Sequence, residues 1–318
     1  MPNLLADLSY VVDVQFWIGV GLLATIYGLL TAGLQLNIGF TGIYNFAQAG
    51  FMAVGAYAMG VLIVRAHWSL WLALPVSSAI AIAFALVLGI STLRLRGDYF
   101  AIATIAAAEV VRYTIQNLHS LTGGTEGLIG FNSEWQKLSN SISSALGLGP
   151  AYYLVPLLLV GAALLLIALG LLMLLQRTPW GRVLEAIRED ENAARALGKP
   201  VFRCKLQSLA IAAFLASIAG YLLVLDLSSL STESFLPEVT FIALAMLLVG
   251  GLGSYWGVLV GVVGLQFVLE ATTTLELPLS EAKFAALRFV LIGAILIAFA
   301  VWRPQGIFGR RSEGAGGR

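Results

Sequence analysis

The sequence has few of the residues that keep a soluble protein in water. Charged residues make up only 11% of its 318 residues, hydrophobic residues make up 59%, and the mean hydropathy is +0.91. Soluble domains carry about 25% charged residues. A soluble fold of this length could not bury so much apolar surface, whereas a bilayer solvates the outer faces of spanning helices. The scarcity of charge therefore predicts a membrane protein.

Cysteine and histidine are scarce too, which limits the chemistry available to the chain. Cys204 is the only cysteine, so an intrachain disulfide and a cysteine-based metal cluster are excluded. The two histidines, His67 and His119, stand in predicted loops without companion ligands. We therefore expect no metal, no cofactor and no catalytic site in this chain. The net charge of +1 gives no indication of nucleic-acid binding.

Two sequence signals are missing altogether. No G-x-x-x-x-G-K-[ST] motif is present, and the only Gly-Lys pair, Gly198 and Lys199, is followed by Pro200. The chain therefore lacks a P-loop for ATP. No Lys or Arg precedes Arg65, so the basic region of a cleavable signal peptide is lacking. The first apolar stretch is expected to be a retained helix.

Long apolar runs are what the sequence has in abundance. They are continuous, as in VPLLLVGAALLLIALGLLMLL, and lack the period-two alternation of transmembrane strands. We predict an all-α transmembrane bundle of about nine spanning helices that forms a single domain over 1–318. The expected spans are 16–36, 44–64, 70–93, 98–118, 151–175, 206–226, 237–252, 256–272 and 284–302.

Basic residues orient these spans, because Lys and Arg in short loops remain in the cytoplasm. The loop 177–205 carries seven of them: Arg177, Arg182, Arg188, Arg195, Lys199, Arg203 and Lys205. We therefore predict that this loop is cytoplasmic, together with Arg94, Arg96 and the C-terminus, and that the N-terminus is outside. The loop 119–150 is then external, with one short helix near 133–144. It either meets an external partner or only connects two spans.

A short amphipathic helix is expected inside the cytoplasmic loop. The stretch WGRVLEAIREDENAARALG places Val183, Ile187 and Leu197 among charged and alanine residues, which is typical of a surface helix. Gly198 and Pro200 provide its stop. Such a helix between two spans suits docking to a partner. The alternative is a basic loop that only fixes orientation.

Residues 179–220, PWGRVLEAIREDENAARALGKPVFRCKLQSLAIAAFLASIAG, resemble the cytoplasmic loop and following helix of permeases of the branched-chain amino acid family of ABC importers. Three further stretches are similar to this family. They are LNIGFTGIYNFAQAGFMAVGAYAMG at 36–60, LRLRGDYFAIATIAAAEVVR at 93–112 and RPQGIFG at 303–309. The second of these resembles the M-type (LivM-like) permease, while Asn45 and Phe46 look more like the H-type.

The resemblance implies a permease subunit in the inner membrane of a prokaryote that forms half of a translocation pathway. It implies a second permease, a related H-type chain, two cytosolic ATPase subunits that bind ATP and Mg, and an external solute-binding protein. Branched-chain or other hydrophobic amino acids are the first expected solutes, and urea, short amides or another small solute are the alternative.

The same resemblance assigns the contact with the ATPase to an EAA-like loop. We expect a helix from Leu184 to Leu197 to move as a rigid lever when the ATPase closes. The residues implied in this coupling are Arg188, Glu189, Asp190, Glu191, Ala193, Ala194 and Gly198.

Polar residues within apolar runs are candidates for the translocation path, since each costs free energy unless it is paired or wet. Five cluster where the first two spans meet: Gln35, Asn37, Thr41, Asn45 and Gln48. Neutral amides and hydroxyls suit a zwitterionic or neutral solute, and hydrogen bonding between helices is the alternative. Glu109 and Arg112, three positions apart, are expected to form a structural pair. An ion-coupled carrier usually needs ionisable groups at the middle of the membrane, where only Glu109 and Arg112 are expected, so this alternative is less favoured than the importer. A channel remains an alternative.

Glycines cluster around the second and eighth predicted spans, within 39–60 and 250–264. Small residues three or four positions apart let helices approach closely in lipid. The alternative is that GFTG and GGLGS interrupt helices beside the pathway.

Overall fold

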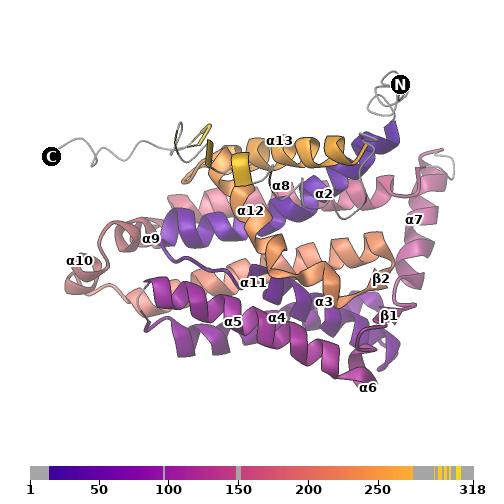
Figure 1. The fold of residues 1–318 in the computed structure, drawn as a ribbon, viewed down its shortest axis with the longest axis horizontal. Coiled ribbons are helices and arrows are strands. Elements are labelled where there is room, and N and C mark those ends of the chain that lie inside the picture. Colours follow the sequence, from indigo (N-terminus) through magenta and orange to yellow (C-terminus); the bar gives the residue numbers. More distant parts are fainter. Residues whose placement is uncertain are drawn as a thin grey trace.

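The computed structural model describes residues 14–95, 97–147 and 152–274, together with 290, 293–295, 297–298, 301 and 306–308. Within these residues the chain is almost entirely helical, and long helices run along the length of the molecule (Figure 1). The predicted all-α bundle is confirmed.

Eight of the nine predicted spans coincide with helices. These are α2 (Val14–Leu34), α3 (Gln48–Val64), α4 (Leu70–Thr92), α5 (Gly97–Asn117), α8 (Val155–Arg177), α11 (Val201–Leu227), α12 (Pro237–Gly250) and α13 (Tyr255–Thr274). Among the described residues, five helices are long and apolar enough to cross a membrane, and α3 and α12 are shorter apolar helices. The predicted span 284–302 lies largely outside the described residues, so the count of nine stays a prediction.

The predicted start of the second span, at residue 44, is wrong. α2 continues into a π-helical segment, η1 (Gln35–Thr41), which ends at Gly42 with φ of 75°. Residues 43–47 are not helical, and α3 begins only at Gln48. The side chain of Asn45 accepts a hydrogen bond from the N–H of Ala47 at 2.9 Å, which offers the backbone a local alternative to a helical turn.

Short elements cover both ends of the bundle. At one end lie α6 (His119–Thr122), β1 (Leu128–Ile129), α7 (Ser133–Ala145), β2 (Ser229–Leu230) and η3 (Thr232–Phe235), and β1 pairs with β2 in antiparallel fashion. α7 confirms the short helix expected near 133–144. α9 (Pro179–Glu189) and α10 (Glu191–Ala196) lie at the opposite end (Figure 1).

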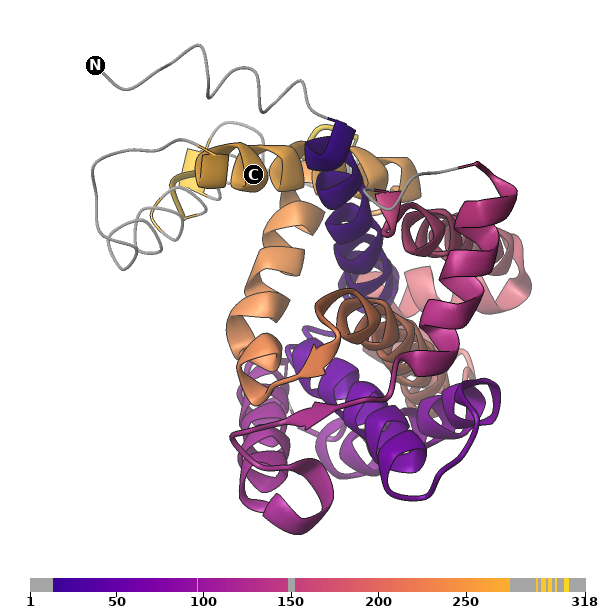
Figure 2. The ribbon, with the colours of Figure 1, turned by 90° about the vertical axis from the view of Figure 1, so that its right-hand side faces the viewer.

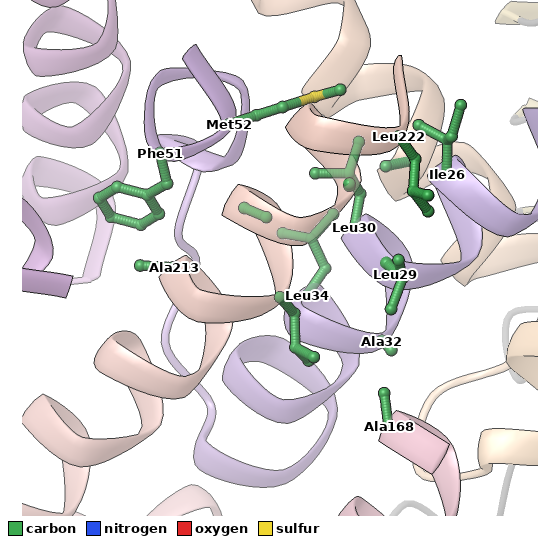
Figure 3. Close-up of a cluster of buried hydrophobic side chains, with 14 of the residues drawn as sticks. Ile26, Leu29, Leu30, Ala32, Leu34, Phe51, Met52, Ala168, Ala213 and Leu222 are labelled. Carbon is green, nitrogen blue, oxygen red and sulfur yellow. The ribbon is translucent and has the colours of Figure 1, made fainter. Parts of the chain in front are cut away.

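α11 is central to the core and packs against α2, α3, α4 and α8. Figure 2 looks along the bundle from the end that carries α7. Figure 3 shows Leu30 and Leu34 of α2 close to α11. A Cβ atom on Gly55 of α3 would stand 2.8 Å from the Cα atom of Ser217, and one on Gly220 would stand 2.6 Å from the carbonyl oxygen of Met52. The packing role predicted for glycine is therefore confirmed between α3 and α11.

Candidate functional site

α9 opens the predicted coupling segment. Thr178 is its N-cap and accepts a hydrogen bond from the N–H of Gly181, while Pro179 occupies the first helical position. Leu184 and Ile187 are buried against the bundle, whereas most of the charged residues of α9 are exposed. The predicted amphipathic character is confirmed.

The prediction of a single helix from Leu184 to Leu197 is wrong, because the helix is interrupted at Asp190. Asp190 has φ of −152° and ψ of 106°, and its Oδ1 atom accepts hydrogen bonds from the N–H groups of Asn192 and Ala193 at 2.8 and 3.0 Å. Asp190 thus caps the new helix α10, and an extended cap cannot continue α9. Leu197, expected on the apolar face, is 77% exposed.

The predicted stop at Gly198 is confirmed. Gly198 has φ of 73°, and its N–H donates to the carbonyl oxygen of Arg195 at 3.0 Å. The N–H of Lys199 donates to the carbonyl oxygen of Ala194 at 3.2 Å. This pair of bonds is a Schellman motif, which ends α10. The chain then enters α11 at Val201.

Glu191 makes two ion pairs at this end of the bundle. Its carboxylate lies 2.8 Å from Arg195 Nη2 and 2.6 Å from Lys205 Nζ. Lys205 was predicted in the loop, but it lies in the second turn of α11. Glu191, Arg195 and Lys205 line a cavity of about 550 Å³ together with Arg94. The two basic loops therefore lie at the same end of the molecule, as the predicted topology requires.

The other predicted coupling residues differ in exposure. Ala194 is only 2% exposed and packs in the core, so it supports α10 from within. The remaining ones are exposed at this end of the molecule: Arg188, Glu189, Asp190, Ala193 and Gly198.

α9 contacts both η1, the π-helical segment that follows α2, and α11. The guanidinium group of Arg188 donates a hydrogen bond to the carbonyl oxygen of Gly39 in η1, and the Arg188 Cα atom would lie 3.2 Å from a Cβ atom on Gly42. Trp180 Nε1 donates to Gln207 Oε1 of α11 at 2.8 Å. A displacement of α9 therefore reaches η1 and α11 directly.

The structure gathers the five predicted polar residues around η1 and the start of α3, each at most 1% exposed: Gln35, Asn37, Thr41, Asn45 and Gln48. Ser208 of α11 joins two of them. Its hydroxyl lies 2.9 Å from Thr41 Oγ1 and donates to Asn37 Oδ1 at 2.8 Å. The sequence did not indicate Ser208, because its partners are 167 and 171 positions away.

Gln48 and Gln35 link separate helices. Gln48 Nε2 donates to the carbonyl oxygens of Leu30 in α2 and Ala212 in α11, both at 3.3 Å. With its amide oxygen turned towards the α12–α13 turn, Gln35 accepts a hydrogen bond from the N–H of Gly253 at 2.7 Å. These contacts favour hydrogen bonding between helices, while a place on the translocation path stays a prediction.

Aromatic residues near the same segment are exposed, and the sequence did not single them out. Tyr44 is 53% exposed and Phe46 is half-buried. The ring of Phe46 lies 5.6 Å from that of Phe241 on α12, which is 44% exposed. Aromatic residues are ordinary in apolar runs, so only the structure distinguishes them.

The predicted pair on α5 is confirmed. Arg112 Nη2 lies 2.7 Å from Glu109 Oε2, and Arg112 Nε donates to Glu109 Oε1 at 3.0 Å. This two-pronged contact neutralises both charges within the helix bundle. Among the described residues, no group of three His, Cys, Asp or Glu side chains could hold a metal ion.

Comparison with known proteins identifies the family. The family described as branched-chain amino acid transport system / permease component matches residues 17–300. The chain belongs to this family. It is 32% identical over 303 residues to the high-affinity branched-chain amino acid transport system permease protein LivM of Escherichia coli (strain K12), covering 91% of this chain and 69% of that protein.

Two further relatives of this permease are less similar to it. It is 27% identical over 293 residues to the probable branched-chain amino acid transport permease protein LivH of Methanocaldococcus jannaschii, covering 88% of each chain. It is 26% identical over 292 residues to the L-arabinose transport system permease protein AraH of Escherichia coli (strain K12), covering 89% of this chain and 81% of that protein. No solved structure matches. The resemblance stated from sequence motifs is confirmed.

In this permease the described part of the C-terminal motif, residues 306–308, packs against the end of α12. The N–H groups of Ile307 and Phe308 donate to the carbonyl oxygens of Val249 and Gly250 at 3.0 and 2.9 Å. The motif thereby satisfies carbonyl groups that α12 leaves free at its end. Phe308 also lines a cavity with Arg177, so the described part of the motif lies at the same end as α9.

Proposed function

We propose that this permease forms half of the translocation pathway of an ATP-driven importer for branched-chain or other hydrophobic amino acids. The family match over residues 17–300 carries the proposal. The likeness to LivM supports the solute class. Urea, short amides or another small solute is the alternative. The likeness to an L-arabinose permease supports a small solute other than an amino acid.

In this proposal the chain itself is not catalytic, and two cytosolic ATPase subunits bind ATP and Mg and hydrolyse the ATP. A second permease, a related H-type chain, completes the pathway, and an external solute-binding protein delivers the solute. The absence of a P-loop from the sequence supports this division of labour. The chain then spans the inner membrane of a prokaryote, with its N-terminus outside and its C-terminus inside.

In this proposal α9 and α10, which are separated by the cap residue Asp190, couple the ATPase to the spanning helices. Movement of the ATPase displaces α9, and the bond from Arg188 to Gly39 passes the displacement to η1. The five buried polar residues around η1 border the pathway in this proposal. Their burial supports a role in holding its wall together.

Charge reversal tests the docking role of α9 and α10. Glu189→Lys is the sharper variant, because Glu191→Lys also breaks the pairs with Arg195 and Lys205. We expect Glu189→Lys to reduce co-purification of the ATPase subunits about tenfold, as the loss of a charged contact does. Glu126→Lys, exposed at the opposite end, is the matched control. Equal recovery of the ATPase with all variants would contradict the proposal.

Transport by the reconstituted complex separates the rival mechanisms. Proteoliposomes that contain both permeases and the ATPase subunits should take up leucine from the binding protein only when ATP is present on the ATPase side. Uptake that persists without ATP would instead indicate an ion-coupled carrier or a channel.

A further inference from the structure

Residues 43–47 are non-helical backbone inside the bundle. The next residue, Gln48, bonds to the carbonyl oxygen of Ala212, which lies eleven residues after Val201 and fifteen before Leu227 in α11. At 1.5 Å per residue, Ala212 is about 16 Å and 22 Å from the two ends of α11. Residues 43–47 therefore run from the end of the molecule that carries α9 to the level of the middle of α11.

Lipid cannot solvate such a stretch. Peptide groups outside regular structure are tolerated at membrane depth only where they are buried in protein or line a water-filled cavity. Burial alternates along the stretch: Ile43, Asn45 and Ala47 are buried, Tyr44 is exposed and Phe46 is half-buried. The N–H groups of Phe46 and Ala47 are bonded within the protein, to Thr104 Oγ1 at 3.1 Å and to Asn45 Oδ1 at 2.9 Å, so the inner face of this stretch is buried, and its outward face carries Tyr44 and Phe46.

A carboxylate lies at the same depth. The N–H of Ala49, in the first turn of α3, donates to Thr240 Oγ1 of α12 at 2.9 Å, so the first turns of the two helices are level. Glu238 is exposed two residues before Thr240, and three residues before Phe241, whose ring contacts Phe46. Among the described residues no hydrogen bond or ion pair engages the Glu238 carboxylate.

An unpaired carboxylate in contact with lipid is costly, so ionisable residues at membrane depth normally face water or a partner. Glu238 shares a face of α12 with Phe241, whose ring lies 5.6 Å from that of Phe46, so a carboxylate and aromatic rings lie on one amphipathic surface level with the first turn of α3. Such a surface matches a small solute that has an ammonium group and an apolar side chain, because the carboxylate binds the ammonium and the rings contact the apolar part.

We propose that Tyr44, Phe46, Glu238 and Phe241 line the translocation pathway, and that Glu238 receives the α-ammonium group of the passing amino acid. The assignment rests on the proposed function for its solute. It differs from the five buried polar residues, whose hydrogen bonds are made within the chain. Glu238 is a specificity-determining residue in this scheme, because solutes without an ammonium group lose its contact.

Thiol accessibility tests the pathway surface. Cys204→Ala gives a cysteine-free background, since Cys204 is the only cysteine. In the complex reconstituted with its partners, Glu238→Cys and Tyr44→Cys should react with a charged, membrane-impermeant methanethiosulfonate at least about tenfold faster than Leu166→Cys, because a thiol in lipid is not ionised. Leu166 lies on the apolar helix α8 and is 61% exposed. Equally slow reaction at all three positions, with and without ATP, would overturn the proposal.

The charge of Glu238 is tested separately by transport. Glu238→Gln keeps the shape and removes the charge, so leucine moved per ATP hydrolysed should fall about tenfold, and Glu238→Asp should restore part of it. A purely structural role would lower the melting temperature of both variants without changing this ratio. An unchanged ratio in Glu238→Gln would refute the ammonium contact. Accessibility does not depend on the solute, so failure of wild-type leucine uptake would count against the proposed function alone.

Discussion

Buried hydrogen-bonding side chains hold η1 and the start of α3 in place in this permease. Ser208 connects Thr41 and Asn37 across two elements, and Gln48 spans from α2 to α11. Each group would be costly in an apolar interior without its partner. At the residue scale these side chains therefore stabilise a backbone that the usual helical hydrogen bonds do not fully support.

Removing the Ser208 hydroxyl should expose this cost. Ser208→Ala leaves Asn37 Oδ1 without its donor and takes one partner from Thr41, so the free energy of unfolding should fall by about 1–3 kcal/mol. Thermal unfolding in detergent measures it. The control is Ser91→Ala, because the exposed Ser91 hydroxyl donates to the carbonyl oxygen of Val87 within its own helix. Equal melting temperatures for the two variants would contradict this prediction.

Close helix contacts and helix interruptions occur together at the scale of elements. Gly42 ends η1, and Gly251 and Gly253 adopt positive φ angles in the turn between α12 and α13. Gly55 brings α3 against α11. The packing interpretation is therefore confirmed at Gly55, and helices do end at GFTG and GGLGS, while the place of these interruptions beside the pathway stays a prediction.

The contact between α3 and α11 should tolerate no added methyl group. A Cβ atom on Gly55 would lie 2.5 Å from the Ser217 Cβ atom, so Gly55→Ala should lower the free energy of unfolding by about 1–3 kcal/mol through overpacking. Gly170→Ala in α8 meets nothing within 4 Å and should be neutral or stabilising. Melting temperatures and gel-filtration profiles in detergent compare the two. A Gly55→Ala variant as stable as Gly170→Ala would show that the helices separate easily.

At the scale of the whole molecule, charge and structure divide the bundle into two ends. Arg94, Arg195 and Lys205 share one cavity, and Phe308 of the C-terminal motif shares another with Arg177. At the other end, Glu134 of α7 accepts a hydrogen bond from the N–H of Leu70 at 2.6 Å. The proposed coupling role requires the basic end to face the cytoplasm.

Labelling from one side of the membrane tests this orientation. In the Cys204→Ala background, His67→Cys should react with an impermeant maleimide added to intact spheroplasts, and Leu197→Cys should react only after permeabilisation. Both side chains are exposed, and they lie at opposite ends of the bundle. Labelling of Leu197→Cys from outside would reverse the topology and remove the proposed docking role of α9 and α10.

Local signals were sufficient for much of this fold. Continuous apolar runs located eight of the predicted spans, and Gly198 with Pro200 marked the end of α10, because helix burial and termination depend on neighbouring residues. The pairing of Glu109 with Arg112 was likewise predictable from a spacing of three. The break at Asp190 was missed, because the residue is equally compatible with a charged helix surface until its cap bonds are seen.

The sequence alone determined that this chain is a helical membrane permease with a charged loop between two apolar halves, because hydropathy and motifs are properties of consecutive residues. The tertiary structure decided that residues 43–47 are not helical, that Ser208 joins Thr41 to Asn37, and that Arg188 reaches Gly39. It also decided that Glu238 lies level with the start of α3. These features depend on contacts between residues far apart in the chain, which only the packing of the helices brings together.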